Sequence, residues 1–305
     1  MRKVYGIGET ICDIIFKDNQ PVAAKAGGST FNAMVTLGRM GVNTSFMSMV
    51  GGDMLGQNII NFMKENNVST ENLTVLGGHK TDVALAFLDE NGDAQYSFYK
   101  DNTKLMNDEN VPNFKRDDIL LLGSFFSLNP ILRPYVKSVL NAARAAQAII
   151  YYDPNFRSSH LHELEILRST IYENIDIAAI IRGSDEDFRN IFGEKGNFLK
   201  ELTNLASQLL ITRNAAGVDV IDSGLDYHFS AKPIVPVSTI GAGDNFNAGF
   251  IYALIKYDIR FDDIKRLNKK DWQNLVETAV DFSTEVCLSY DNYVSLEFAE
   301  KYSKN

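Results

Sequence analysis

Short apolar runs alternate with longer stretches of helical periodicity along most of this chain of 305 residues. The runs are rich in Val, Ile and Leu and end at polar or turn residues, which is typical of buried strands. The stretches between them repeat apolar residues at helical spacing. This alternation predicts an α/β fold with a doubly wound, mostly parallel sheet flanked by helices. The expected strands cover residues 4–8, 10–16, 42–50, 119–123, 148–152, 175–181, 209–212 and 218–221, and the expected helices residues 29–41, 55–65, 130–146, about 162–172 and about 272–288, the last closing the fold.

One segment does not follow this rhythm. Residues 81–88 and 94–99 have the weak alternation of strands, and the turn residues DENGD separate them at 89–93. This pattern predicts a β-hairpin. A hairpin between strand–helix units is a candidate for an inserted lid over a site, and a plain edge hairpin is the alternative. We expect one domain over residues 1–305, with lid segments at about residues 10–25 and 81–100 inserted in it.

The most informative stretch is residues 235–254, VPVSTIGAGDNFNAGFIYAL. An apolar approach turns on Gly241 and Gly243 and continues as an amphipathic helix. The glycines let the backbone come close to a ligand, and the first N–H groups and positive dipole end of the helix favour an anion. Asp244 sits at this helix start, where it either caps the helix or accepts a proton from an acceptor hydroxyl during phosphoryl transfer.

Polar residues also follow other expected strands. Since ligands of such sheets bind beyond the carboxyl ends of the strands, we expect these residues to share one cleft. They are Asp153, Asn155, Ser184, Thr212 and Asp244. Ser184 is expected to cap the helix that carries Asp187.

Two further polar residues stand in apolar surroundings near the N-terminus. Asp13 lies among Ile and Cys residues, and is either on the wet face of its strand or an acceptor for ligand hydroxyls. Asn32 lies one turn inside a helix that Ser29 or Thr30 can cap. Its amide, with two donors and two acceptor lone pairs, suits a polyol.

Composition and charge narrow the classes of partner. The hydrophobic fraction of 45% is typical of a globular protein, and the net charge of −9 argues against nucleic acid or an anionic membrane as the main partner. Cys12 and Cys287 have no metal-ligand spacing and indicate buried thiols in a reducing compartment. The nearby pair His160 and His162 favours a solvated helix start over a metal site. Without a visible targeting or membrane-spanning segment, a cytoplasmic protein is expected.

These residues carry a specific resemblance. The chain resembles the ribokinase-like (PfkB) family of carbohydrate kinases over nearly its full length. Residues 27–32 (GGSTFN) through Gly41, followed by residues 50–56 (VGGDMLG), match the N-terminal signature of the family, and residues 240–246 (IGAGDNF) match its C-terminal signature. Gly8-Glu9 with Asp13, and residues 153–157 (DPNFR), are most similar to the fructokinase branch.

The resemblance implies ATP-dependent phosphorylation of a sugar hydroxyl, with fructose favoured and Mg2+ accompanying ATP. Other acceptors stay open: 2-keto-3-deoxygluconate, ribose or a nucleoside, as does a catalytically silent sugar-binding regulatory protein on the same fold. Lys100, at the end of the lid, either pairs with the carboxylate of a sugar acid or is solvated. The β lid implies a homodimer.

The resemblance also assigns roles to individual residues. The catalytic set is Asp244 as base with the N–H groups of Gly241, Ala242 and Gly243 as anion hole. The substrate set is Asp13, Gly28 and Asn32 for sugar hydroxyls, with Arg157 approaching phosphates. The nucleotide set is Asn155, Ser184, Thr212, Gly217 and Gly243, and the metal residue is Asp187.

Three positions depart from the family pattern. Ser238 stands where the family usually has Asp, and Asn214 where it usually has Gly. The helix after Ser184 carries Asp187 where a Glu is usual. These departures bear on cation dependence, nucleotide affinity and metal placement, and they leave Asp244 unchanged.

Overall fold

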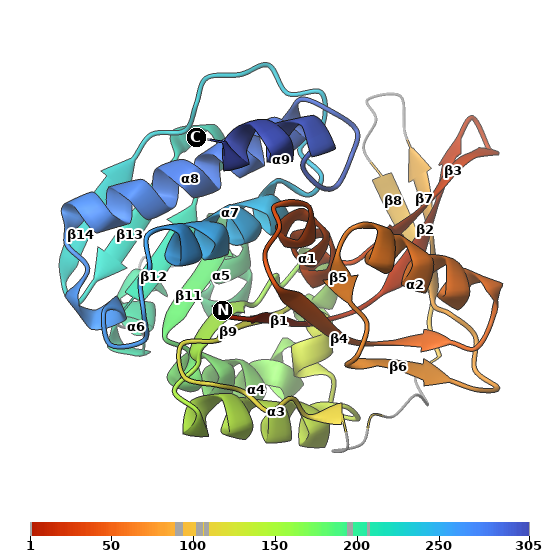
Figure 1. Ribbon diagram of the computed structural model, residues 1–305, viewed down its shortest axis with the longest axis horizontal. Coiled ribbons are helices and arrows are strands. Elements are labelled where there is room, and N and C mark those ends of the chain that lie inside the picture. Colours follow the sequence, from red (N-terminus) through yellow and green to blue (C-terminus); the bar gives the residue numbers. More distant parts are fainter. Residues whose placement is uncertain are drawn as a thin grey trace.

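A ten-stranded sheet forms the centre of the computed structural model, which describes residues 2–88, 94–101, 106, 110–193, 198–205 and 208–304 (Figure 1). Its strands follow the order β14-β13-β12-β11-β10-β9-β1-β4-β5, and β6 also pairs with β4. Within this described sheet the pairings are parallel, except those of β13 with β12 and β14. The strands are β1 (Val4–Ile7), β4 (Thr44–Gly51), β5 (Val68–Ser69), β6 (Leu73–Leu76), β9 (Ile119–Gly123), β10 (Ile149–Asp153), β11 (Ile180–Ser184), β12 (Gln208–Thr212), β13 (Val218–Asp222) and β14 (Leu225–Phe229). The predicted doubly wound, mostly parallel sheet is confirmed.

Helices cover both faces of this sheet (Figure 1). One face carries α1 (Ser29–Arg39), α2 (Met54–Glu65), α7 (Ala242–Lys256), α8 (Lys269–Cys287) and α9 (Leu296–Ser303). The other face carries α3 (Arg133–Ala145), α4 (Leu164–Ile177), α5 (Asp185–Phe192) and α6 (Phe198–Leu205). Short 3-10 turns are η2 (Phe125–Leu128), η3 (Ser158–Glu163), η4 (Asn214–Ala216) and η5 (Ile264–Arg266).

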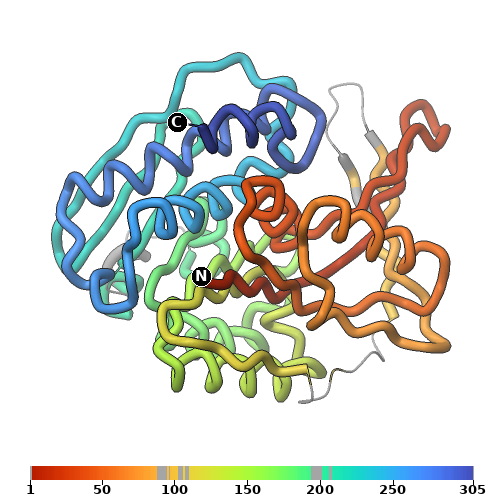
Figure 2. The backbone as a smooth tube through the Cα atoms, viewed as in Figure 1, coloured from red at the N-terminus to blue at the C-terminus, as the bar shows by residue number. Residues whose placement is uncertain are grey.

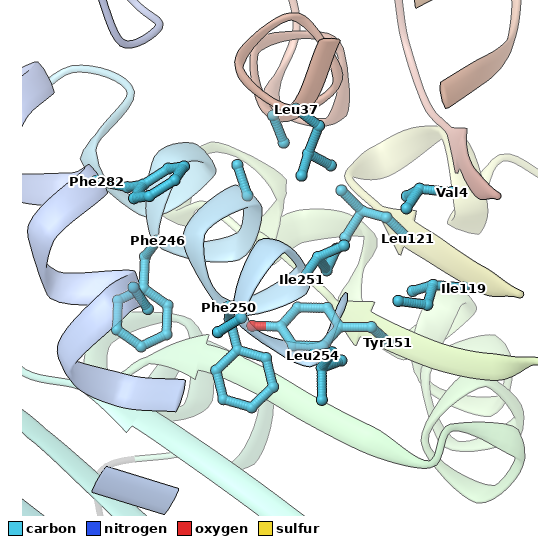
Figure 3. Packing of buried hydrophobic residues seen from close by; sticks show 14 of the residues in the cluster. Val4, Leu37, Ile119, Leu121, Tyr151, Phe246, Phe250, Ile251, Leu254 and Phe282 are labelled. Atoms are coloured by element: carbon cyan, nitrogen blue, oxygen red, sulfur yellow. The ribbon is translucent and has the colours of Figure 1, made fainter. Parts of the chain in front are cut away.

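Strand side chains alternate between the two faces, as the pleat requires. In β1, Val4 packs with the cluster under α7, whereas Tyr5 packs with the cluster under α3. Figure 3 shows the first cluster, where the ring of Tyr151 from β10 lies 5.4 Å from that of Phe250. The burial of both strand faces explains the near-continuous apolar runs in the sequence.

Helix α7 is buried almost all round, so the predicted amphipathic character is wrong. It lies between the sheet and α8, and residues 245–251 are all buried. Gly249 makes this layering possible, since a Cβ there would lie 2.8 Å from the Cα of Ala279 in α8. The helix that begins at the glycine turn is therefore held rigidly from both sides.

A second, four-stranded sheet has the order β3-β2-β7-β8. It projects beside α2 at one side of the molecule, as the chain path in Figure 2 shows. Its strands are β2 (Ile11–Lys17), β3 (Gln20–Gly27), β7 (Val83–Leu88) and β8 (Ala94–Tyr99). The antiparallel pairing of β7 with β8 confirms the predicted hairpin, whose turn at residues 89–93 lies outside the described residues.

Several predicted boundaries are wrong. The strand expected at residues 175–181 is divided, because Ile171 and Ile175 continue the buried face of α4 to Ile177 and β11 begins at Ile180. Helix α3 begins at Arg133 rather than residue 130. The helix at residues 269–287 is not the last, since α9 follows it. Strands β3, β5, β6 and β14 and helix α6 were not predicted as elements.

Candidate active site

The turn before α7 has the open geometry that its glycines predict. Gly241 has a φ of 78°, in the left-handed region, and a Cβ there would lie 3.0 Å from the carbonyl oxygen of Asn292. Among the described residues, the N–H groups of Gly241 and Gly243 have no hydrogen-bond acceptor, whereas that of Ala242 donates to the Thr239 carbonyl at 3.2 Å. Two donors at the positive end of a helix dipole can thus bind an anion.

Asp244 is held by the start of α1, although 215 positions separate it from Ser29. Its Oδ1 accepts a hydrogen bond from Ser29 Oγ at 2.8 Å, and its Oδ2 accepts one from Asn32 Nδ2 at 2.9 Å. Burial raises the pKa of Asp244, against the opposing effect of these two bonds. Helix α7 has no side-chain cap, so Asp244 is not a capping residue. An oriented carboxylate with a raised pKa is suited to accept a proton from a hydroxyl.

The start of α1 lacks the side-chain cap that the sequence predicted. Gly28 is the N-cap residue with a φ of 129° and makes no side-chain cap. A Cβ at Gly28 would lie 2.2 Å from the Glu9 carbonyl oxygen, so only glycine fits. The prediction that Ser29 or Thr30 caps this helix is wrong, because Ser29 turns to Asp244 instead.

Two acceptors for hydroxyl groups lie beside this pair. Asn32 Oδ1 is buried and has no hydrogen-bond partner, while its Nδ2 is used by Asp244. The carboxylate of Asp13 bends over Gly27, where a Cβ would lie 2.6 Å from Oδ2. Burial raises the pKa of Asp13 to about 6. The predicted substrate residues Asp13, Gly28 and Asn32 are thus brought together with Asp244.

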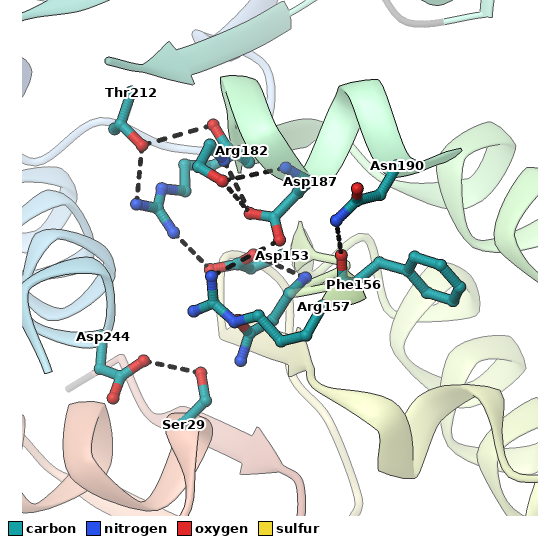
Figure 4. Close-up of polar contacts among 12 residues, drawn as sticks. Ser29, Asp153, Phe156, Arg157, Arg182, Asp187, Asn190, Thr212 and Asp244 are labelled. Atoms are coloured by element: carbon teal, nitrogen blue, oxygen red, sulfur yellow. Dashed lines mark hydrogen bonds and ion pairs between the residues drawn. The ribbon is translucent and has the colours of Figure 1, made fainter. Parts of the chain in front are cut away.

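A second polar cluster lies at the carboxyl ends of β10, β11 and β12 (Figure 4). Arg182 Nη1 donates to Asp153 Oδ2 at 2.8 Å, and its Nη2 donates to Thr212 Oγ1 at 2.9 Å. Arg157 Nη1 lies 3.8 Å from Asp187 Oδ1. The expected convergence of polar residues beyond the strands is therefore present, around an arginine that was not predicted.

Asp187 and Ser184 cap α5 reciprocally. Ser184 Oγ accepts from the Asp187 N–H at 3.0 Å, and Asp187 Oδ2 accepts from the Ser184 N–H at 2.8 Å, which confirms the predicted cap. Burial, and then the negative charge of Asp153, raises the pKa of Asp187. Asp187 Oδ1 is buried and accepts no hydrogen bond, and Arg157 Nη1 is in ion-pair range of it at 3.8 Å.

The two clusters adjoin at Gly243. A Cβ on Gly243 would lie 3.0 Å from both terminal nitrogens of Arg182, so the guanidinium lies directly against the glycine turn. The positive charge of Arg157 also reaches Asp244, whose raised pKa it partly offsets. Asp244, the glycine turn and the two arginines therefore form one electrostatic unit.

Other predicted residues have structural contacts of their own. The hydroxyl of Thr212 is engaged by Arg182. Gly217 has a φ of 99°, and a Cβ there would lie 2.2 Å from the Phe229 carbonyl oxygen. Asn214 adopts a left-handed φ of 49°, which explains how Asn replaces the usual Gly. The Asn155 N–H donates to Asp153 Oδ1, and the Ser238 hydroxyl accepts from the Ile240 N–H at 3.2 Å.

The residues that the structure describes do not form a metal site on their own. In the part of the chain that the structure describes, no three His, Cys, Asp or Glu side chains gather as a metal site. Mg2+ is usually held by one or two carboxylates together with substrate phosphates, and Asp187 Oδ1, which accepts no hydrogen bond and has only the long 3.8 Å contact with Arg157, fits that mode. Nor does any helix in the described ranges have the length and apolar character needed to cross a membrane.

Ser29, Arg182 and Asn247 belong to the site but were not singled out as site residues in the sequence. Asn247 Nδ2 donates to Asp153 Oδ2 at 2.6 Å. A charged residue between Ile181 and Gly183, at the end of a buried strand, is the signal that identifies Arg182.

Comparisons with known proteins identify the family of the chain. Residues 1–298 match the pfkB family carbohydrate kinase model. The chain is 25% identical over 260 residues to a fructokinase of Salmonella typhimurium, which covers 83% of this chain and 84% of that protein.

Solved structures show the same fold. A double mutant of the fructokinase of Vibrio cholerae O395, with fructose, ADP and a potassium ion bound, superposes with a TM-score of 0.84 at 20% identity, covering 97% of this chain and 95% of that one. The aminoimidazole riboside kinase of Salmonella enterica, complexed with its riboside and an ATP analogue, gives a TM-score of 0.83 at 18% identity and 99% coverage of both chains. With the family match extending over nearly the whole sequence, the chain belongs to the pfkB family of carbohydrate kinases and is a phosphotransferase with an alcohol group as acceptor.

Proposed function

We propose that this enzyme transfers the γ-phosphoryl group of ATP to a hydroxyl of a neutral sugar, with fructose as the favoured acceptor. The observation that carries the proposal is the placement of Asp244 at the start of α7, oriented by Ser29 and Asn32 beside two free N–H groups. Asp244 takes the proton of the attacking hydroxyl. The N–H groups of Gly241 and Gly243 stabilise the charge on the moving phosphoryl group.

Hydrogen-bond acceptors of the protein surround the sugar in the proposed complex. Asp13 and Asn32 Oδ1 receive hydrogen bonds from sugar hydroxyls, and the backbone of Gly28, whose carbonyl accepts from the Asn32 N–H, lies beside them. The alternatives that share this chemistry are ribose and nucleosides, and a riboside kinase has the same fold. Fructose is favoured because the curated relative and the Vibrio structure are fructokinases.

A sugar acid is disfavoured by the pairing of Lys100. Its Nζ lies 2.9 Å from Glu9 Oε1, so its charge is already neutralised at the wall of a small cavity of about 40 Å3. A carboxylate entering here would compete with Glu9 for the ammonium group. This pairing supports a neutral acceptor over 2-keto-3-deoxygluconate.

The nucleotide enters from the side of Asp187 and Arg157 in this proposal. Bound Mg2+ would neutralise phosphate charge, and Asp187 is the side chain that would hold it. Arg157 contacts a phosphate, and Asn155, Ser184, Thr212 and Gly217 line the nucleotide path. Since Thr212 and Ser184 are already hydrogen-bonded within the protein, they form the wall of this path and do not bind the nucleotide through their hydroxyls.

We further infer a single kinase domain in which the four-stranded sheet of β2, β3, β7 and β8 is the lid. Exposed apolar side chains on this sheet, Val22 and Tyr99 among them, favour a homodimer through the lid. The cytoplasm is the expected compartment because both cysteines are free thiols. Light scattering of the purified protein tests the dimer.

The test of function is coupled detection of ADP release across fructose, ribose, 2-keto-3-deoxygluconate and a nucleoside. The expected result is the highest kcat/KM with fructose and little turnover of the sugar acid. A clear preference for the sugar acid would contradict the role given to the Glu9–Lys100 pair. Absence of ADP release with every acceptor would contradict the proposed function.

A further inference from the structure

Arg182 is a buried cation that the catalytic roles above do not use. The residue is 7% exposed, and its guanidinium lies 5.4 Å from the ring of Phe246. Burial alone would lower the pKa of Arg182, but the negative charge of Asp153, together with Tyr151, Asp187 and the hydrogen bond to Asp153, outweighs burial and holds the pKa above its ordinary value. A buried charge is costly unless it is paired, so its place beside the glycine turn requires an explanation.

The guanidinium joins three parts of the site. One arm donates to Asp153 at the end of β10 and the other to Thr212 at the end of β12. Its flat end lies against Gly243, where a Cβ would lie 3.0 Å from both terminal nitrogens. The first turn of α7 therefore rests on an arginine that two neighbouring strands hold in place (Figure 4).

Asp153 extends this support to the loop that carries Arg157. Its Oδ2 accepts from Arg182 and from Asn247 of α7, while its Oδ1 accepts from the Asn155 N–H at 3.0 Å. Asn155 has a left-handed φ of 43°, a conformation that needs external support in a residue with a side chain. Two residues later, Arg157 lies near Asp187, and its positive charge partly offsets the raised pKa of Asp244.

We propose that Arg182 is a positioning residue for phosphoryl transfer. It holds the Gly243 turn directly and, through Asp153, sets the position of Arg157. The N–H donors of the turn and the guanidinium of Arg157 are thereby directed at the same phosphoryl group. The inference rests on the proposed function. Because a small displacement of such groups affects the transition state more than ground-state binding, loss of the arginine fork lowers kcat and leaves the KM for sugar nearly unchanged.

Arg182→Lys tests this proposal, because lysine keeps the charge but cannot reach Asp153 and Thr212 together. The expected kcat is lower by about 10-fold to 100-fold, with the KM for fructose within about threefold of wild type. The matched control is Arg2→Lys. Arg2 donates to the carbonyls of Asp117, Leu254 and Ile259, so the control also loses an arginine fork, outside both polar clusters of the site. It is expected to lower the unfolding temperature and to keep the wild-type kcat.

Asp153→Asn provides a second variant if Arg182→Lys does not fold. An amide has one oxygen, which cannot serve both Arg182 and the Asn155 N–H, so the same fall in kcat with an unchanged KM is expected. Active-site titration with a tight-binding ATP analogue corrects each kcat for the folded fraction. A corrected kcat within twofold of wild type in the variant that folds, or an equal fall in Arg2→Lys, would overturn the positioning role. Wild-type enzyme without ADP release would instead refute the proposed function.

Discussion

Asp13 offers the sharpest prediction, because its two expected effects have opposite signs. The proposed sugar contact is a carboxylate that no described residue neutralises, and burial raises its pKa to about 6. Asp13→Asn replaces it with a neutral side chain of nearly the same shape. We expect the variant to be more stable than wild type without sugar at neutral pH, and to bind sugar more weakly.

The expected gain in the free energy of unfolding follows from the pKa values of Asp13 in the folded and the unfolded chain. Its folded-state pKa of about 6 exceeds the ordinary value of 3.8, so the folded protein binds the proton more tightly than the unfolded chain. Wild type therefore loses stability as pH rises from about 4 to about 6, by up to about 3 kcal/mol, and the loss persists above pH 6. Asn does not titrate, so Asp13→Asn gains up to that amount at pH 7.5 and almost nothing at pH 4. Sugar binding should weaken by about 1–3 kcal/mol through the lost charged acceptor.

Urea unfolding at pH 4 and pH 7.5, together with calorimetric titration of fructose, measures both effects. The control is Asp226→Asn, which neutralises an exposed carboxylate on β14 and is expected to change neither quantity. A variant no more stable than wild type at pH 7.5 would refute the argument from burial. Unchanged fructose affinity would refute the sugar contact, and an equal loss of ATP affinity would make Asp13 structural.

Three other predictions concern single contacts. Hydrogen bonds from Thr81 and Gly56 outweigh burial and lower the pKa of Asp53 to about 2. Asp53→Ala should therefore lower the free energy of unfolding in urea by about 1–2 kcal/mol at pH 7, after allowance for solvent screening, and by less as pH falls toward 2. Ser238 brings no charge, and its hydroxyl accepts a hydrogen bond from the Ile240 N–H. Exchanging potassium for a bulky organic cation at fixed ionic strength should therefore change the initial rate by less than about twofold, and a several-fold fall would contradict this. Ser238→Asp should strengthen any dependence of the rate on potassium. Because burial raises the pKa of Asp244 and protonation blocks its role, kcat at saturating substrates should fall on acidification with a midpoint above 3.8, the ordinary pKa of an aspartate. A rate that is constant down to that pH would exclude Asp244 as base.

The sequence correctly predicted those features that depend only on residues close together in the chain. The glycine turn at Gly241, the hairpin and the Ser184 cap follow from short-range chemistry, and the structure has each of them. The prediction for Ser29 failed because two partners compete for its hydroxyl. An exposed helix start would take it as a cap, but the fold brings Asp244 within 2.8 Å.

What could not be predicted depends on strand order. The Arg182–Asp153 pair forms because β10 and β11 are neighbours, and no spacing in the sequence specifies that. The strand expected at residues 175–181 failed for a related reason, since Ile175 and Ile180 are equally apolar but pack in a helix and a strand. The burial of α7 on all sides likewise follows from the layer that α8 adds.

The central claim is that Asp244 is the base that accepts the proton of the sugar hydroxyl. Its most direct test is the kcat of Asp244→Asn measured by ADP release with fructose, alongside calorimetric titration of fructose into the same protein. The amide can keep the contact with Ser29 and cannot take up the proton. We expect kcat to fall by about 10²–10⁴-fold while fructose binding stays measurable. An Asn variant that keeps most of the wild-type rate would contradict it.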